Sequence, residues 1–116
     1  MHEASVAQSI LNIASKKLAC TAHTDTVTAI HVIIGQFRNI DVDSLKFAFD
    51  NIRETYSGCS NCKLEAEVVR ARATCRGCSR TYNPDVATSF RCPVCGNGVG
   101  QLISGEELDV IGITLR

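Results

Sequence analysis

Two Cys-x-x-Cys pairs place the strongest constraint on how this chain can fold. The first is Cys75-Arg76-Gly77-Cys78, the second is Cys92-Pro93-Val94-Cys95, and thirteen residues separate them. Each pair can form a tight turn that directs two sulfur atoms toward one point. Two facing turns give four thiolates in the closed tetrahedral geometry of a structural zinc site, which leaves no position open for a substrate water. The spacing therefore predicts Zn(II) held by Cys75, Cys78, Cys92 and Cys95 and places any activity elsewhere in the chain.

A third pair, Cys59-Ser60-Asn61-Cys62, competes for the same role. The segment 63–74 alternates apolar and polar residues and is typical of a strand. Fully extended, its twelve residues would span about 40 Å and carry the third pair away from Cys75. The segment between the other two pairs contains Asn83-Pro84-Asp85, a turn signal that lets the chain reverse. Cys59 and Cys62 remain open as reactive thiols, a second metal site or inert residues in a turn, and the inert interpretation is favoured.

The pattern along the rest of the chain predicts an α+β fold. Helical spacing covers residues 3–18, and a β-branched run at 26–34 predicts a strand with cover on both faces. Asp41 and Asp43 are candidate N-caps of a second helix that continues to about residue 56. After the metal loop, 101–104 and 108–115 are expected to be short strands. We expect two helices with a small mixed β-sheet in an α+β unit, 1–74 and 97–116, and an inserted zinc-ribbon-like lobe, 75–96. Cys20 is expected to be a small residue at a helix end.

Composition excludes several functional classes. Twelve basic residues balance twelve acidic ones, so no net field draws the chain toward nucleic acid or a membrane surface. The first residues lack the pattern of a signal peptide, and no segment is long and apolar enough to cross a bilayer. Seven cysteines are an odd number, which favours metal-bound thiolates in a reducing cytoplasm over a disulfide framework.

The residues at the start of the chain suggest a second kind of metal chemistry. His2 places an imidazole beside the α-amine of Met1 and the adjacent backbone nitrogens. These groups can close fused chelate rings around one ion, and Ni(II) and Cu(II) favour such nitrogen-rich tetragonal sites. A helix that begins near Glu3 would leave its first N–H groups without intrahelical partners and free to lose a proton to a metal.

Several motifs occur together in one order: Met1-His2-Glu3 opening a helix, Ile34-Gly35, Asp43-Ser44-Leu45-Lys46-Phe47-Ala48-Phe49, and the two Cys-x-x-Cys pairs. In this combination the chain resembles, over essentially its whole length, the HypA/HybF family of hydrogenase nickel-incorporation accessory proteins. The Cys59-x-x-Cys62 pair is outside that pattern.

The resemblance implies a metallochaperone rather than an enzyme. It implies transferable Ni(II) on the α-amine of Met1, on His2 and on the backbone nitrogens of His2 and Glu3, with the side chain of Glu3 or Asp41 assisting. It also implies structural Zn(II) on the four cysteines named above. The implied partners are a HypB-type GTPase and the large subunit of [NiFe]-hydrogenase, and a homodimer is a further candidate assembly.

Two other classes compete with this interpretation. A nucleic-acid-binding zinc ribbon or adapter module would use the arginines around the cysteine pairs, but base-stacking aromatic residues are scarce. A thiol-disulfide protein would use Cys59 and Cys62. No phosphate-binding loop, Ser-His-Asp order or paired-carboxylate site supports hydrolytic or nucleotide chemistry.

Overall fold

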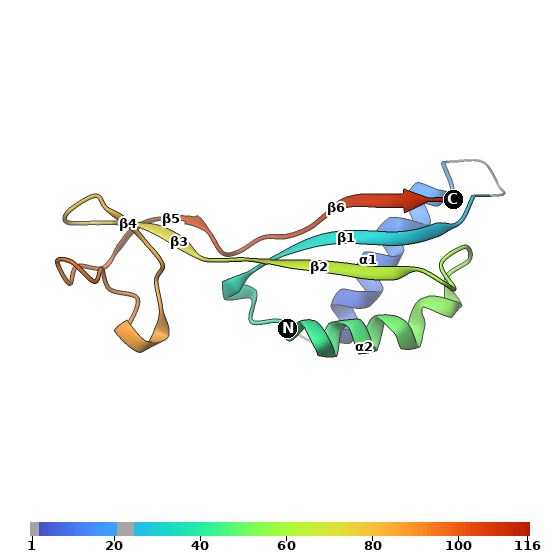
Figure 1. Ribbon diagram of the computed structural model, residues 1–116, viewed down its shortest axis with the longest axis horizontal. Coiled ribbons are helices and arrows are strands. Elements are labelled where there is room, and N and C mark those ends of the chain that lie inside the picture. The colour runs from blue at the N-terminus through green and yellow to red at the C-terminus, as the bar shows by residue number, and fades with distance from the viewer. Residues whose placement is uncertain (1–2, 21–24) are drawn as a thin grey trace.

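The computed structural model describes residues 3–20 and 25–116. They form two lobes placed end to end, and the molecule measures 57 × 24 × 15 Å. The large lobe holds both α-helices and a three-stranded sheet (Figure 1). The small lobe holds a second three-stranded sheet and all four cysteines of the predicted zinc site. The α+β prediction with a separate metal lobe is confirmed.

The two helices follow from local sequence signals. Helix α1 (Glu3–Leu18) has the predicted bounds and buries one apolar stripe. Helix α2 (Val42–Ile52) continues into the 3-10 helix η2 (Arg53–Thr55). Of the two predicted caps, Asp41 is the one used: its Oδ1 accepts from the backbone N–H groups of Asp43 at 3.0 Å and Ser44 at 3.4 Å. These bonds satisfy donors that the first turn would otherwise leave unpaired.

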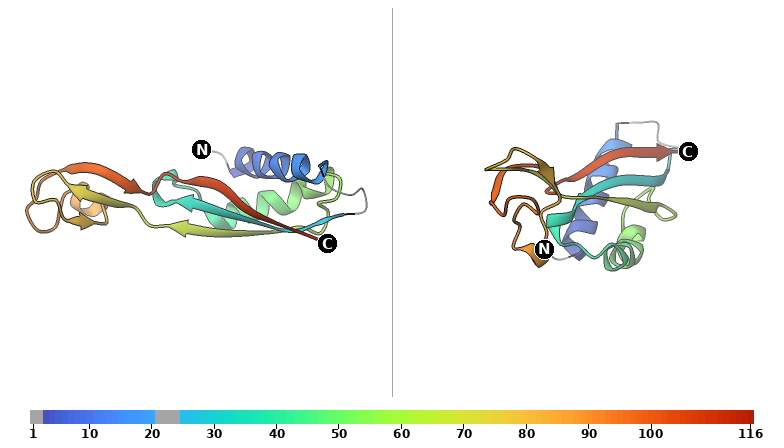
Figure 2. Two further views of the ribbon diagram at one scale, coloured as in Figure 1. Left: turned by 90° about the horizontal axis from the view of Figure 1, so that it is seen from above. Right: turned by 60° about the vertical axis from the view of Figure 1, so that its left-hand side comes forward.

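Strand β1 (Val27–Gly35) is the centre of the large sheet. It pairs in parallel with β2 (Lys63–Val69) and antiparallel with β6 (Leu108–Leu115), so the sheet is mixed as predicted. Both helices lie on the same face of this sheet (Figure 2). Ile30, Val32 and Ile34 are buried, whereas the alternate residues His31 and Ile33 are half-buried. The expected cover on both faces is therefore wrong, because no helix in the described part of the chain packs on the second face.

The segment predicted as one strand, 63–74, is two strands in different sheets. Strand β2 ends at Val69, and β3 (Arg72–Cys75) begins the small sheet with β4 (Thr81–Tyr82) and β5 (Val99–Ser104). Between them the backbone N–H of Ala71 donates to Gln36 Oε1 at 2.8 Å rather than to a strand. The small sheet thus runs from residue 72 to 104, beyond the limits of 75–96 expected for the zinc lobe. Of the two strands expected after the metal loop, only β6 belongs to the large sheet.

Contacts from the 3-10 helix η1 (Gln36–Arg38) join the two lobes. The side-chain amide of Asn83 donates to Gln36 Oε1 at 3.1 Å and to the carbonyl oxygen of Ala71 at 2.6 Å. The rings of Phe37 and Phe90 meet edge to face, with centroids 5.8 Å apart. Residues of η1 therefore contact the small lobe at two places: the segment between β2 and β3, and the loop before the second cysteine pair.

The core of the large lobe gives a matched test of the fold. Phe49 is fully buried on α2, whereas Phe47 on the same helix is 71% exposed. We expect Phe49→Ala to lower the free energy of unfolding by about 3–5 kcal/mol, because it removes apolar contacts and leaves a cavity. Phe47→Ala should change it by less than about 0.5 kcal/mol. Denaturant titration of both variants measures this, and equal losses would contradict the assigned burial.

Candidate metal centre

The four cysteines predicted to bind zinc converge in the small lobe. Their sulfur atoms all lie within 4.8 Å of one another. The Sγ atoms of Cys75 and Cys95 are 3.2 Å apart, and those of Cys78 and Cys92 are 3.7 Å apart. A tetrahedral zinc ion 2.3 Å from each sulfur would separate them by roughly 3.8 Å. The four thiol groups therefore fit a structural zinc ion with only small adjustments.

Backbone turns position these sulfurs. The N–H groups of Gly77 and Cys78 both donate to Cys75 Sγ, at 3.3 and 3.4 Å. In the second pair the backbone N–H of Cys92 donates to the carbonyl oxygen of Asn97 at 2.8 Å, and the Asn97 side chain donates to Cys95 Sγ at 3.3 Å. Donors aimed at sulfur stabilise the thiolate, which is the form that binds metal.

The thiols of the cluster titrate unequally. Hydrogen bonding from the backbone of Asn97, assisted by Cys75, lowers the pKa of Cys95 to about 6. The backbone N–H groups of Cys95 and Val94 lower the pKa of Cys92. The backbone of Arg80 acts to lower the pKa of Cys78, but desolvation and the neighbouring thiols raise it to about 11. Cys92 and Cys95 therefore lose their protons more readily than Cys78, and a thiolate is the form that binds a metal cation.

Sequence reasoning missed two residues that hold the second pair in place. Asn97 lies in the Gly-Asn-Gly segment after Cys95, which the sequence presented only as a turn. Tyr82 donates its hydroxyl to the carbonyl oxygen of Phe90 at 2.6 Å and so braces the loop before Cys92. A polar residue that can reach back to a nearby sulfur is the signal that would have pointed to Asn97.

The third cysteine pair lies in the other lobe. Cys59 and Cys62 are fully buried in the core of the large lobe, apart from the cluster that contains Cys75 and Cys92. Burial raises the pKa of both thiols and brings that of Cys62 to about 12. Because the thiolate is the reactive form, this setting opposes thiol-disulfide chemistry and favours the inert interpretation. Cys20 is exposed just beyond the end of α1, where a small residue was expected.

The predicted nickel ligands are only partly covered by the described residues. Met1 and His2 lie outside them. Glu3 is the first residue of α1, and Asp41 precedes α2. Both helices start at the end of the large lobe that faces the small lobe (Figure 2), so Glu3 and Asp41 share that end. No helix within the described ranges is long and apolar enough to span a membrane.

The fold and the site define a two-lobe metal-binding protein with a four-cysteine centre in its smaller lobe. Residues 1–115 match the family model described as "Hydrogenase/urease nickel incorporation, metallochaperone, hypA", and the chain belongs to this HypA family.

The relatives include two hydrogenase maturation factors and one protein of another name. The chain is 34% identical to the hydrogenase maturation factor HypA of Chloroflexus aggregans, and the match covers 97% of each chain. It is 33% identical to HypA of Chlorobaculum parvum over the full length of both. A match of 26% identity covers 95% of this chain and 91% of the guanidine hydrolase-activating protein A of Synechocystis.

The solution structure of the Ni metallochaperone HypA from Helicobacter pylori shares the fold. Its TM-score is 0.65 at 23% identity, and the match covers 97% of this chain and 96% of that one. A second HypA solution structure gives a TM-score of 0.70 at 22% identity, covering 100% and 97% of the two chains.

Proposed function

We propose that this protein binds Ni(II) at its N-terminus and delivers it during [NiFe]-hydrogenase maturation, while Zn(II) holds the small lobe in one conformation. The observation that carries the proposal is the start of α1 at Glu3. A backbone N–H in the first turn has no intrahelical partner, so it can be deprotonated by a metal without loss of a helix bond. The α-amine of Met1, the imidazole of His2 and these nitrogens then form the nitrogen-rich set that Ni(II) favours.

An acidic side chain would complete the nickel site, and Glu3 suits this role better than Asp41. The Asp41 carboxylate already accepts two backbone N–H groups and the hydroxyl of Ser44, at 3.2 Å. A carboxylate offers about four acceptor positions, so the cap occupies most of them. Binding nickel through Asp41 would compete with the start of α2, whereas the Glu3 side chain belongs to a residue whose backbone nitrogen is already part of the proposed chelate.

The release of nickel from the N-terminal site follows from the same ligand chemistry. Ligands that must lose a proton give an affinity that falls as pH falls, and the thiolates of a recipient protein compete with them effectively. The closed four-thiolate site has no open position, so zinc stays in place while nickel leaves. The protein thus acts by transfer and not as an enzyme.

The proposed units are the nickel-binding large lobe and the zinc lobe. Residues 75–96 form the centre of the zinc lobe, and strands β3 and β5 flank them.

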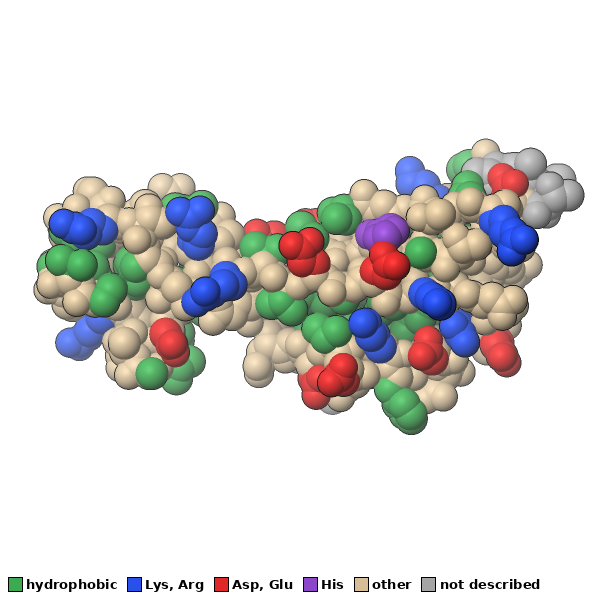
Figure 3. All heavy atoms as spheres, viewed as in Figure 1, with side chains coloured by type: hydrophobic (Ala, Val, Ile, Leu, Met, Phe, Trp, Pro, Cys, Tyr) green, Lys and Arg blue, Asp and Glu red, His purple; other side chains and the backbone are tan. Residues whose placement is uncertain are grey.

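The small lobe also suits docking of a partner protein. Of the twelve basic residues, five arginines fall within 70–105, where Asp85 is the only acid. In Figure 3 basic side chains predominate over acidic ones on this lobe, whereas both kinds are mixed over the large lobe. The proposed partners are a HypB-type GTPase and the large subunit of [NiFe]-hydrogenase, in the cytoplasm.

A transfer assay tests the proposal. Tag-free protein carrying one zinc and one nickel per chain is mixed with the precursor of the hydrogenase large subunit, with and without the GTPase and GTP. We expect nickel to appear in the large subunit and zinc to stay behind, as measured by metal analysis of the separated proteins. Retention of nickel, loss of zinc, or submicromolar sequence-selective binding of an oligonucleotide near physiological salt would contradict the proposal.

A further inference from the structure

A closed ring of hydrogen bonds joins the two lobes at one side chain. Gln36 Oε1 accepts from the backbone N–H of Ala71 at 2.8 Å and from the side-chain amide of Asn83 at 3.1 Å. The same amide of Asn83 donates to the carbonyl oxygen of Ala71 at 2.6 Å. Ala71 is fully buried between β2 and β3, and a buried N–H that loses its acceptor is costly. Gln36 therefore holds the segment that leads into the small lobe.

An aromatic contact holds a second part of the small lobe. The ring of Phe37, next to Gln36 in η1, meets the ring of Phe90 edge to face. Phe90 has a φ of +64°, which a bulky side chain rarely adopts. Its N–H donates to the carbonyl oxygen of Asp85 at 2.8 Å, and its carbonyl oxygen accepts the hydroxyl of Tyr82. Such a conformation persists only where the surroundings hold it, so the ring of Phe90 is fixed in place toward Phe37.

The segment that returns from the small lobe is bound to η1 as well. The backbone N–H of Phe37 donates to the carbonyl oxygen of Gly105 at 2.8 Å, and Arg38 Nε donates to that of Glu106 at 2.7 Å. Gly105 has a φ of +124°, and a Cβ atom there would lie 2.8 Å from the Cβ of Ala71. The two chain segments that link the lobes thus lie against each other and against η1.

The same 3-10 helix leads directly to the proposed nickel end of the large lobe. Asn39 follows η1 with a φ of +54°, and Asp41 then caps α2. Helix α1 begins with Glu3 at this end (Figure 2). Figure 1 shows η1, in teal at the end of β1, next to the segments that lead into the small lobe. η1 therefore contacts the small lobe on one side and continues into the nickel end on the other.

We propose that Gln36 and Phe37 are positioning residues for the transfer of nickel. Their contacts hold the small lobe in one orientation, so that a recipient protein docked on that lobe faces the nickel end. Holding two reacting groups in one geometry raises the rate of their reaction, because fewer orientations have to be sampled. This inference rests on the proposed function and adds to it the residues that set the geometry of the transfer.

The double variant Gln36→Met with Phe37→Ala tests this role. It removes both side-chain contacts and changes none of the proposed metal ligands, so its zinc content and Ni(II) affinity should match those of the wild type. Residual dipolar couplings of the two lobes should fit one alignment tensor in the wild type and two in the variant. The maximal rate of nickel transfer to the large-subunit precursor should fall about tenfold. The precursor concentration that gives half this rate should stay unchanged, because the docking surface of the small lobe is intact.

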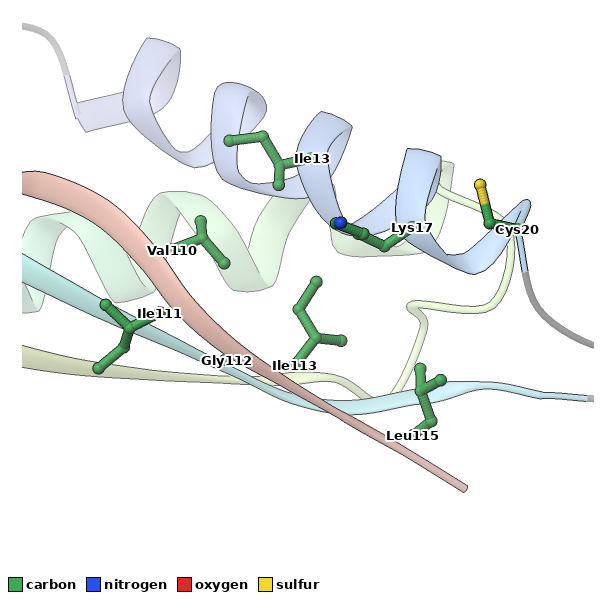
Figure 4. Close-up of a pocket in the computed structure, with 8 residues that line it drawn as sticks. All are labelled: Ile13, Lys17, Cys20, Val110, Ile111, Gly112, Ile113 and Leu115. Carbon is green, nitrogen blue, oxygen red and sulfur yellow. The ribbon is translucent and has the colours of Figure 1, made fainter.

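Two single variants serve as controls. Gln36→Glu keeps an acceptor for both donors and should retain one alignment tensor and the wild-type rate. Lys17→Met introduces a methionine in the last turn of α1, beside a groove of about 430 Å³ between α1 and β6. Figure 4 shows Lys17 on the α1 wall of this groove and Ile113 and Leu115 on the β6 wall. Lys17→Met should transfer nickel at the wild-type rate, because the proposed docking surface lies on the small lobe.

The measurements separate the positioning role from the proposed function. One alignment tensor in the double variant, or two tensors together with transfer at the wild-type rate, would overturn the positioning role alone. Slower transfer by Gln36→Glu would show that the rate does not depend on these hydrogen bonds, and slower transfer by Lys17→Met would place the recipient in the groove; either result overturns it. Failure of the wild-type protein to transfer nickel would contradict the proposed function and the positioning role together.

Discussion

Cys92→Ser is expected to release zinc and unfold the small lobe while the large lobe stays folded. The buried core of the small lobe consists of Ala73, Cys75, Tyr82 and Cys92, so two of its four residues belong to the four-cysteine cluster proposed to bind zinc. A core of this size cannot offset the conformational entropy of ordering the lobe. Structural zinc contributes about 10–16 kcal/mol of apparent binding free energy in small domains, and this energy is folding energy. Metal analysis and backbone NMR of the variant measure both losses.

The matched control replaces the other cysteine pair. Cys59→Ser with Cys62→Ser should keep one zinc per chain, because both thiols lie in the core of the large lobe. The same variant should lower the stability of the large lobe, since each hydroxyl is buried where a thiol packed against apolar groups. Zinc loss from this variant together with zinc retention in Cys92→Ser would show that the ligands are assigned to the wrong pairs.

One residue inserted before Met1 is expected to abolish specific nickel binding and to spare zinc and the fold. The insertion keeps every side chain but moves the α-amine away from His2, so the fused chelate rings can no longer close. Acetylation of the amine and His2→Ala should have the same effect, because each removes one nitrogen ligand. Calorimetric titration of each variant with Ni(II) gives the affinity, and its zinc content serves as the internal control.

His31→Ala supplies the matched histidine control for this titration. His31 lies on the open face of the large sheet, where its Nδ1 is 2.7 Å from Glu65 Oε2, and α1 lies on the opposite face. We expect this variant to bind nickel with wild-type affinity. A site made only of side chains, such as His2 with His23 or His31, would tolerate the insertion. Unchanged nickel affinity in the extended protein would therefore contradict the N-terminal chelate.

Features that depend on neighbouring residues could be predicted from the sequence. The bounds of α1 follow from its apolar spacing, and the cap of α2 was narrowed to Asp41 or Asp43, of which the structure uses Asp41. The convergence of the four cysteines belongs to the same class, because a Cys-x-x-Cys turn orients its own sulfurs, and their binding of zinc stays a prediction. The nickel ligands Met1 and His2 stay a prediction, since they lie outside the described residues.

The division of 63–74 between two sheets could not be predicted, because it depends on a distant side chain. Gln36 supplies the acceptor for the N–H of Ala71 thirty-five residues away in sequence. Once the chain turns there, β3 pairs with β5, and the lobe extends beyond the cysteine pairs. Alternation within the segment shows that each half is extended, but it carries no information on which partner each half takes.

The sequence alone determined which four cysteines meet, where α1 starts and which family the motifs resemble, because each of these depends on spacing along the chain. Only the tertiary structure decided that Cys59 and Cys62 are buried, that one face of the large sheet is open and that β6 is an edge. It also placed the arginine-rich segment 70–105 on the small lobe and most of the acidic residues on the large lobe. Burial, edges and surface charge depend on which distant segments pack together, and local patterns do not specify that packing.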